Sequence, residues 1–136
     1  MFHLIKILNS RIGVPEPAKI ALSTPATVRY GMPVLIKNGT LTPMSGSSTA
    51  LPTHLILADG TSVSEVLATP ITPEMLFEVP LSVAPTGMKA EGEYLIAEDG
   101  MSLTATAVSS GKRGATLVNA AGAYAAGDNV IVSFKN

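Results

Sequence analysis

Few side chains in this 136-residue chain could do chemistry: there are two histidines, His3 and His54, and no cysteine or tryptophan. A histidine near a serine and an aspartate could activate a nucleophile, and two histidines with carboxylates could bind zinc. Neither histidine lies in a Gly-x-Ser-x-Gly nucleophile motif, and no close metal-ligand spacing is present. The sequence therefore predicts no enzyme, no metal site and no cofactor.

Acidic and glycine-rich turns could bind calcium or phosphate. Asp59 and Asp99 each precede a glycine, and Asp128 follows one, which is a feature of calcium loops. The three aspartates are far apart in the sequence, and aspartate and glycine are also the residues that tight turns require. Residues 109–114 lack the spacing of a phosphate-binding loop. We interpret all four as turns, with the basic pair in residues 109–114 either solvated or facing an acidic partner.

The composition indicates a protein that packs against other protein. Charged residues make up 14% of the chain and hydrophobic residues 46%, whereas a soluble domain carries about a quarter charged residues. Part of the exterior is therefore expected to be covered. A net charge of -1, with no basic run longer than Lys112-Arg113, makes nucleic acid a poor partner. No segment approaches the roughly 20 apolar residues of a membrane span, so we expect no membrane partner.

Short apolar runs separated by turn residues predict an all-β fold, either a small β-barrel or a compact β-sandwich. Asn38-Gly39 between two such runs favours a type I′ hairpin, because both residues tolerate positive φ. Asp99-Gly100 separates a second pair of runs in the same way. The expected strands are residues 34–37 with 40–42, 93–98 with 101–108, 54–58 buried on both faces, and 114–118 paired antiparallel with 130–134.

The first 24 residues differ from the rest of the chain. Pro15 and Pro17 favour extended backbone and block helix, so we expect residues 1–24 to be an extended N-terminal arm and residues 25–136 to be a single β domain. The apolar arm could form the first strand of the domain's own sheet or add a strand to a neighbouring chain. The sequence is compatible with both arrangements.

Several short segments resemble those of a known family. Residues 71–81, Ile-Thr-Pro-Glu-Met-Leu-Phe-Glu-Val-Pro-Leu, and their continuation to Gly87 resemble a recurrent segment of small proteins encoded beside the major capsid gene of tailed bacteriophages. The order of the other segments is similar to that in head decoration, or cement, proteins. These segments are the hairpin at residues 31–39, Pro-Thr-His at 52–54, residues 93–108, and Ala-Gly-Asp-x-Val at 126–130.

The resemblance covers residues 28–134 and implies a virion protein without catalytic residues. Such a protein is made in the host cytoplasm, binds the outer surface of the capsid through the major capsid protein, and stabilises the shell. It is expected to be a homo-oligomer, with a trimer as the expected form, or to contact neighbouring copies on the shell. The candidate contacts to the capsid or to a neighbouring copy are Phe2, Leu4, Ile5 and Ile7 in the arm, and Met75 and Phe77.

Two alternatives accompany this hypothesis. Met75 and Phe77 could be ordinary core residues rather than contacts. The protein could also be a carbohydrate-binding or host-surface-binding module displayed on the virion, although three tyrosines and no tryptophan provide few aromatic faces on which sugars could stack.

Overall fold

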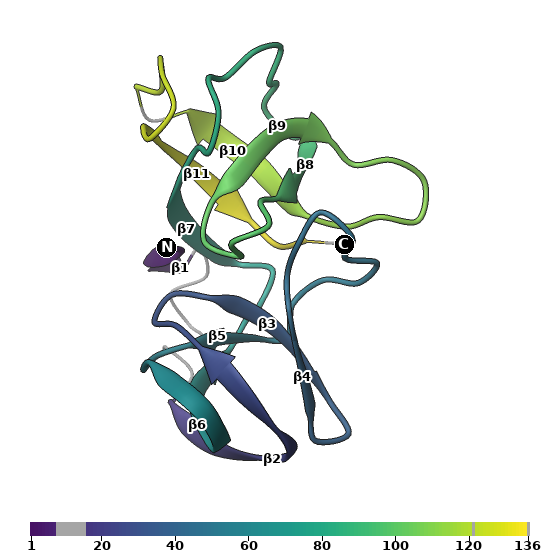
Figure 1. Ribbon diagram of the computed structural model, residues 1–136. Coiled ribbons are helices and arrows are strands. Elements are labelled where there is room, and N and C mark those ends of the chain that lie inside the picture. The colour runs from purple at the N-terminus through teal and green to yellow at the C-terminus, as the bar shows by residue number, and fades with distance from the viewer. Residues whose placement is uncertain (8–15, 121, 136) are drawn as a thin grey trace.

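The computed structural model describes residues 1–7, 16–120 and 122–135, and these ranges form an all-β fold without helices, as predicted (Figure 1). The strands of this part of the chain are β1 (His3–Ile7), β2 (Ala18–Val28), β3 (Pro33–Lys37), β4 (Thr40–Pro43), β5 (His54–Ile56), β6 (Gly60–Pro70), β7 (Met75–Pro80), β8 (Glu93–Ile96), β9 (Leu103–Ala107), β10 (Ala115–Ala120) and β11 (Asn129–Ser133).

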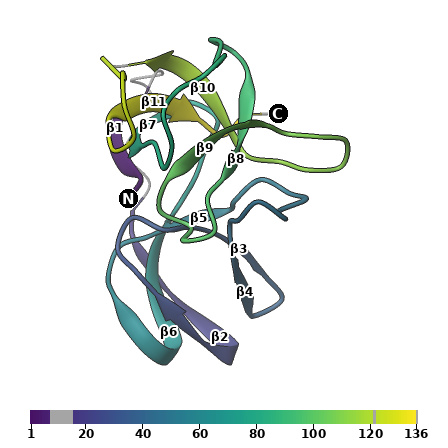
Figure 2. The ribbon, with the colours of Figure 1, turned by 45° about the horizontal axis from the view of Figure 1, so that its top comes forward.

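The strands form two antiparallel sheets that make up two lobes (Figures 1 and 2). The six-stranded sheet has the order β1-β7-β11-β10-β8-β9, and the five-stranded sheet has the order β2-β6-β5-β3-β4. The five-stranded sheet is a nearly closed barrel. Its edges approach each other where the Ser23 backbone N–H on β2 donates a 2.9 Å hydrogen bond to the Gly39 carbonyl between β3 and β4.

The β3–β4 hairpin has the predicted turn. Asn38 and Gly39 have φ values of 52° and 76°, as a type I′ turn requires, and Lys37 pairs with Thr40. A Cβ atom on residue 39 would lie 2.9 Å from the Ser23 Oγ. Glycine at this position therefore serves both the turn and the closure of the barrel.

The other predicted pairings are also present. Ile96 of β8 pairs with Leu103 of β9, and Leu117 of β10 pairs with Val132 of β11. The predicted strands 93–98 and 101–108 extend beyond the observed ones, because residues 97–102 form the connecting turn.

β5 lies between two hydrophobic cores. Leu55 is 4% exposed and belongs to the larger core, whereas its neighbour Ile56 is 0% exposed and belongs to the barrel core. The larger core consists of Phe2, Met44, Leu55, Met75, Phe77, Val79, Leu81, Tyr94, Ile96, Leu103, Ala115, Leu117, Val130, Val132 and Phe134. Successive side chains of a strand point to opposite faces, so this strand is buried on both faces, as predicted. The barrel core consists of Leu22, Val28, Met32, Val34, Ile56, Val66 and Ala68.

The N-terminal residues belong to the sheets. β1 pairs antiparallel with β7, with Leu4 opposite Phe77, so the described residues show the own-sheet arrangement of the two that were open. The boundary expected after residue 24 falls inside β2, which pairs with β6 on both sides of that residue, from Ala18 to Ala21 and again at Ala26 and Val28. Residues 8–15, including Pro15, lie outside the described residues.

Candidate functional site

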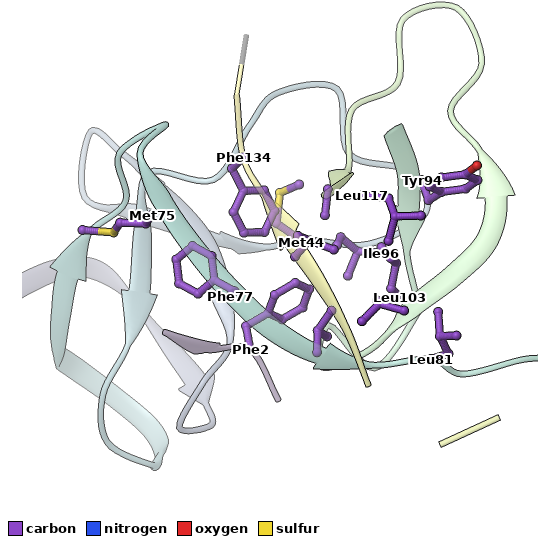
Figure 3. Packing of buried hydrophobic residues seen from close by; sticks show 14 of the residues in the cluster. Phe2, Met44, Met75, Phe77, Leu81, Tyr94, Ile96, Leu103, Leu117 and Phe134 are labelled. Atoms are coloured by element: carbon purple, nitrogen blue, oxygen red, sulfur yellow. The ribbon is translucent and has the colours of Figure 1, made fainter. Parts of the chain in front are cut away.

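Three of the six predicted contact residues lie in the larger core. Phe2, Met75 and Phe77 have exposed fractions of 1%, 0% and 0%. The Phe134 ring packs against the rings of Phe2 and Phe77, with centroid distances of 5.6 Å in both cases (Figure 3). Core packing, the alternative for Met75 and Phe77, is therefore what the structure shows, and these side chains are inaccessible to a partner of the folded chain.

A β-bulge decides which of the other predicted contacts are exposed. Leu4 pairs with Phe77 and Lys6 with Leu76, so Ile5 is the extra residue of β1. The bulge shifts the alternation of side chains, which lets Leu4 and Ile7 pack against the larger core while Ile5 is 43% exposed. Of the six candidates, Ile5 is the one that presents a largely exposed apolar side chain.

The most exposed large hydrophobic side chain of the described residues was not among the predicted contacts. Tyr124 is 88% exposed and lies in the connection between β10 and β11. Next to this connection lies the segment after β7, because the Leu81 N–H donates to the Asp128 carbonyl and the Gly127 N–H donates to the Leu81 carbonyl, at 2.9 and 2.8 Å. Tyr124 stands in an Ala- and Gly-rich run without alternation, so periodicity gave no signal for it.

Two of the three aspartates bond within their own turns, as predicted: the Asp99 and Asp128 carboxylates accept hydrogen bonds from backbone N–H groups two to four residues away. Asp59 differs, because its carboxylate accepts a hydrogen bond from a backbone N–H 29 residues away in the sequence and so joins two separate segments. The pairs are Asp59 with the Tyr30 N–H at 2.7 Å, Asp99 with the Met101 N–H at 2.8 Å, and Asp128 with the Tyr124 and Ala125 N–H groups at 2.8 and 3.1 Å.

A pocket of about 190 Å³ opens on the barrel lobe. It is lined by Leu35 and by residues between 42 and 50, and no charged residue lines it. Met44, one of the lining residues, is 2% exposed and belongs to the larger core, so the pocket lies directly against that core. We call it the 42–50 pocket.

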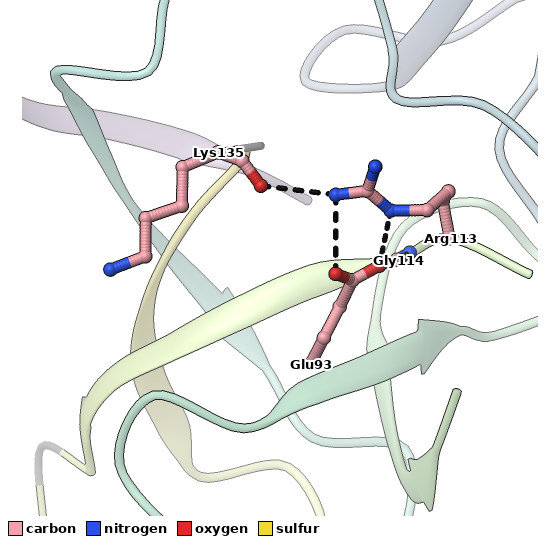
Figure 4. Close-up of polar contacts among 4 residues, drawn as sticks. All are labelled: Glu93, Arg113, Gly114 and Lys135. Carbon is pink, nitrogen blue, oxygen red and sulfur yellow. Dashed lines mark hydrogen bonds and ion pairs between the residues drawn. The ribbon is translucent and has the colours of Figure 1, made fainter. Parts of the chain in front are cut away.

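One residue of the basic pair in residues 109–114, Arg113, meets an acidic partner within the same chain. Arg113 donates from Nε and Nη2 to the two carboxylate oxygens of Glu93, at 3.0 and 3.3 Å, and from Nη2 to the Lys135 carbonyl at 3.1 Å (Figure 4). The same carboxylate accepts the Gly114 N–H at 2.7 Å, and the Arg113 N–H donates to the Ser48 carbonyl at 2.8 Å. This segment therefore joins β8, the C-terminal residues and the loop that lines the 42–50 pocket.

Replacing Arg113 with Met is expected to lower the free energy of unfolding by about 1–2 kcal/mol, because the charge-assisted hydrogen bonds of Arg113 are lost. The loss is no larger because both side chains are partly exposed, and solvent weakens the ion pair. The Arg113 and Glu93 side chains are 30% and 19% exposed. Urea unfolding of Arg113→Met, of Glu93→Gln and of the double variant measures the interaction free energy between the two side chains. The matched control is Lys112→Met, which should change stability by less than about 0.5 kcal/mol; an equal loss in the control would contradict the assignment.

His54 lies in a structural environment at the start of β5. Its Nδ1 atom is 2.8 Å from the Thr53 Oγ1, and the same hydroxyl accepts the Ile36 N–H at 2.9 Å. Burial lowers the pKa of His54 because it disfavours the charged imidazolium. These hydrogen bonds orient β3 against β5. The hydroxyl beside the imidazole is already bonded to the backbone, which is a structural role.

The depressed pKa of His54 predicts a loss of stability in weak acid. The unfolded chain binds the proton near the ordinary pKa of about 6.5, whereas the folded chain binds it only at lower pH. The His54 contribution is therefore fully present above pH 6.5 and is lost as the pH falls below that value. Urea midpoints measured between about pH 5 and 7.5 should fall with acidification in the wild type and fall less steeply in His54→Gln. Parallel profiles would exclude His54 as the cause.

Metal sites and membrane-spanning helices can be assessed for the part of the chain that the structure describes. Among the described residues, no group of three His, Asp or Glu side chains is placed to hold a metal ion. In the same residues, no helix has the length and apolar character needed to cross a bilayer.

Comparison with known proteins provides no relative from which a function could be transferred: no protein-family model matches the chain, and no curated protein matches it. The features of the chain that bear on its function are therefore the short segments described above and the surfaces of the molecule.

Proposed function

We propose that this protein is a non-enzymatic structural protein of a tailed-phage virion, which binds the outside of the capsid and stabilises the shell. The observation that carries the proposal is the resemblance of residues 71–87, together with the order of the other similar segments. In the fold these segments are structural units: β7 with the segment after it, the β3–β4 and β8–β9 hairpins, and the start of β11.

The surface supports this role. Five large hydrophobic side chains of the described residues are exposed, and they lie mainly near β1 and in the segments that follow β7 and β10. They are Met1, Ile5, Tyr30, Val83 and Tyr124. A protein that binds only the intact shell shifts the equilibrium away from disruption by mass action, and contacts with little charge make such attachment insensitive to salt.

The test is cosedimentation of the purified chain with empty heads assembled from the major capsid protein of the same phage. Saturable binding at a fixed ratio to capsid subunits is expected, with binding retained in about 0.5 M salt because few charges take part. Absence of binding at saturating protein concentrations would overturn the proposal.

A point substitution can examine the remaining N-terminal contact. A deletion from the N-terminus to the end of β1 would also remove Phe2 from the core, so Ile5→Glu is the sharper variant. We propose that Ile5 contacts the capsid, in which case Ile5→Glu weakens binding to heads. The matched control is Thr24→Glu, which adds the same charge at an exposed position of β2 and should bind as the wild type does.

A carbohydrate-binding or host-surface-binding module is the second candidate, and the exposure of Tyr124 is the observation that favours it. An exposed aromatic ring offers a face to a sugar. Of the six aromatic side chains, however, only Tyr30 and Tyr124 are exposed, at 43% and 88%. Binding on a glycan array that Tyr124→Ala abolishes would support this alternative, and an array without hits would dispose of it.

A further inference from the structure

Tyr124 is held in place by its backbone while its ring stays in solvent. Its N–H donates to the Asp128 Oδ2 at 2.8 Å, and the segment that carries it is bonded to Leu81 through the Gly127 N–H. The ring is nevertheless 88% exposed. The backbone that presents the ring is therefore already ordered, which lowers the entropy cost of binding, and tyrosine is enriched among residues that dominate binding energy.

The 42–50 pocket has the chemistry to receive a tyrosine ring. Leu35, Pro43 and Met44 provide an apolar lining, and Thr42 and Thr49 are among the residues that carry hydroxyl groups there. Its volume of about 190 Å³ is large enough for one aromatic side chain. A buried tyrosine needs an apolar site for its ring and a polar partner for its hydroxyl, and this pocket offers both.

The pocket is built on rigid parts of the fold. Met44 is in the larger core, and its N–H donates to the Pro33 carbonyl at 3.2 Å. The Arg113 N–H donates to the Ser48 carbonyl at 2.8 Å, which fixes the opposite side of the loop. The pocket therefore exists before a ligand arrives, as is usual for binding sites.

The charge of the two surfaces fits a contact between copies of the chain. The one charged side chain in the turn that carries Tyr124 is Asp128, whose carboxylate is bonded to backbone N–H groups of that turn, and no charged residue lines the pocket, so neither surface requires a charged partner. In both ribbon views, the segment that carries Tyr124, between β10 and β11, lies on the opposite side of the molecule from the segment after β4 (Figures 1 and 2). One chain therefore cannot fill its own pocket with its own ring.

We propose that copies of this protein associate head to tail, with Tyr124 of one copy inserted into the 42–50 pocket of the next. Contacts between two different patches are heterologous and produce a closed ring or an open chain. A single anchoring ring buries a small area, so the association is weak in solution and becomes substantial where copies are crowded. This contact rests on the proposed function, because it is on the capsid shell that copies of the protein would be crowded together.

The test uses the purified chain alone. In sedimentation velocity from about 10 μM to about 1 mM, the range of weak affinities, the wild type should sediment faster as its concentration rises. Tyr124→Ala should weaken association by roughly 30-fold or more, as expected for a dominant contact. Ala50→Arg, at an exposed position on the pocket rim, should do the same by filling the pocket. Tyr30→Ala, which removes the other exposed tyrosine, is the control and should associate normally.

Mixing the two defective variants distinguishes a head-to-tail contact from any other. Tyr124→Ala retains the pocket and Ala50→Arg retains the ring, so the mixture should form a 1:1 dimer that neither variant forms alone and that does not grow further. A wild type that remains monomeric at about 1 mM, variants that associate normally, or a mixture without dimer would each overturn the proposal. Head binding is measured separately, so loss of the capsid role would leave this result unaffected.

Discussion

Replacing Phe134 with Ala is expected to lower the free energy of unfolding by about 3–5 kcal/mol, the usual cost of removing a buried aromatic ring. The side chain is 2% exposed and packs against Phe2 from the N-terminus and Phe77 from β7, with both ring centroids 5.6 Å away. Its removal leaves a cavity at the point where both chain ends meet β7. Urea unfolding followed by near-UV circular dichroism measures the change.

Two controls show whether packing is the cause. Phe134→Leu restores much of the volume and should cost far less than Phe134→Ala, under about 1.5 kcal/mol if the site repacks. Tyr124→Ala removes an aromatic ring that is 88% exposed and should change stability by less than about 0.5 kcal/mol. If Phe134→Ala cost no more than Tyr124→Ala, the arrangement of the three phenylalanines would be wrong.

The sequence predicted the parts of the fold that depend on neighbouring residues. Asn38-Gly39 specifies a type I′ turn by itself, since both residues accept positive φ, and the flanking runs need only fold back on each other. The β8–β9 pair followed from an equally local pattern, and the uninterrupted apolar run of β5 indicated burial on both faces. The two hairpin predictions are correct because the partner strand and the turn are close in the sequence.

The N-terminal region could not be assigned in this way. β1 pairs with β7, about 70 residues later in the chain, with Leu4 opposite Phe77, and no local pattern specifies that partner. Pro25 within β2 also disguised a strand, because proline is tolerated only at edges and bulges; β2 is an edge strand with a register shift between Ala21 and Ala26. The alternation of Met75, Phe77 and Val79, all fully buried, was a signal for a core strand.

The candidate interaction surface was beyond sequence reasoning for a different reason. Tyr124 and the 42–50 pocket are both embedded in runs of small, uncharged residues, which look alike as loops. They differ in three dimensions. The ring of Tyr124 is exposed to solvent on a hydrogen-bonded turn, whereas the 42–50 pocket is a recess whose lining residue Met44 belongs to the larger core. Surface complementarity of this kind appears only when the loops are placed on the body.

Gly114→Ala is the second substitution with a large expected effect, a loss of at least about 3 kcal/mol from the free energy of unfolding. A Cβ atom on residue 114 would overlap the Tyr94 carbonyl group and lie 3.2 Å from the Leu95 Cα atom. Both are backbone atoms of β8, which is paired with β10 on one side and with β9 on the other. The strand therefore cannot shift without breaking one of these pairings.

The same substitution should reach beyond the steric overlap. The Gly114 N–H donates to Glu93 at 2.7 Å, and Glu93 holds Arg113, so displacing residue 114 also disturbs the ion pair of Figure 4. The matched control is Gly46→Ala, whose Cβ atom would meet its nearest neighbours at 3.8 Å, an ordinary contact. Urea unfolding should show a change of less than about 0.5 kcal/mol for the control. Equal stability of the two variants would mean that β8 and β10 are not packed as described, because a backbone overlap between fixed strands has no inexpensive relief.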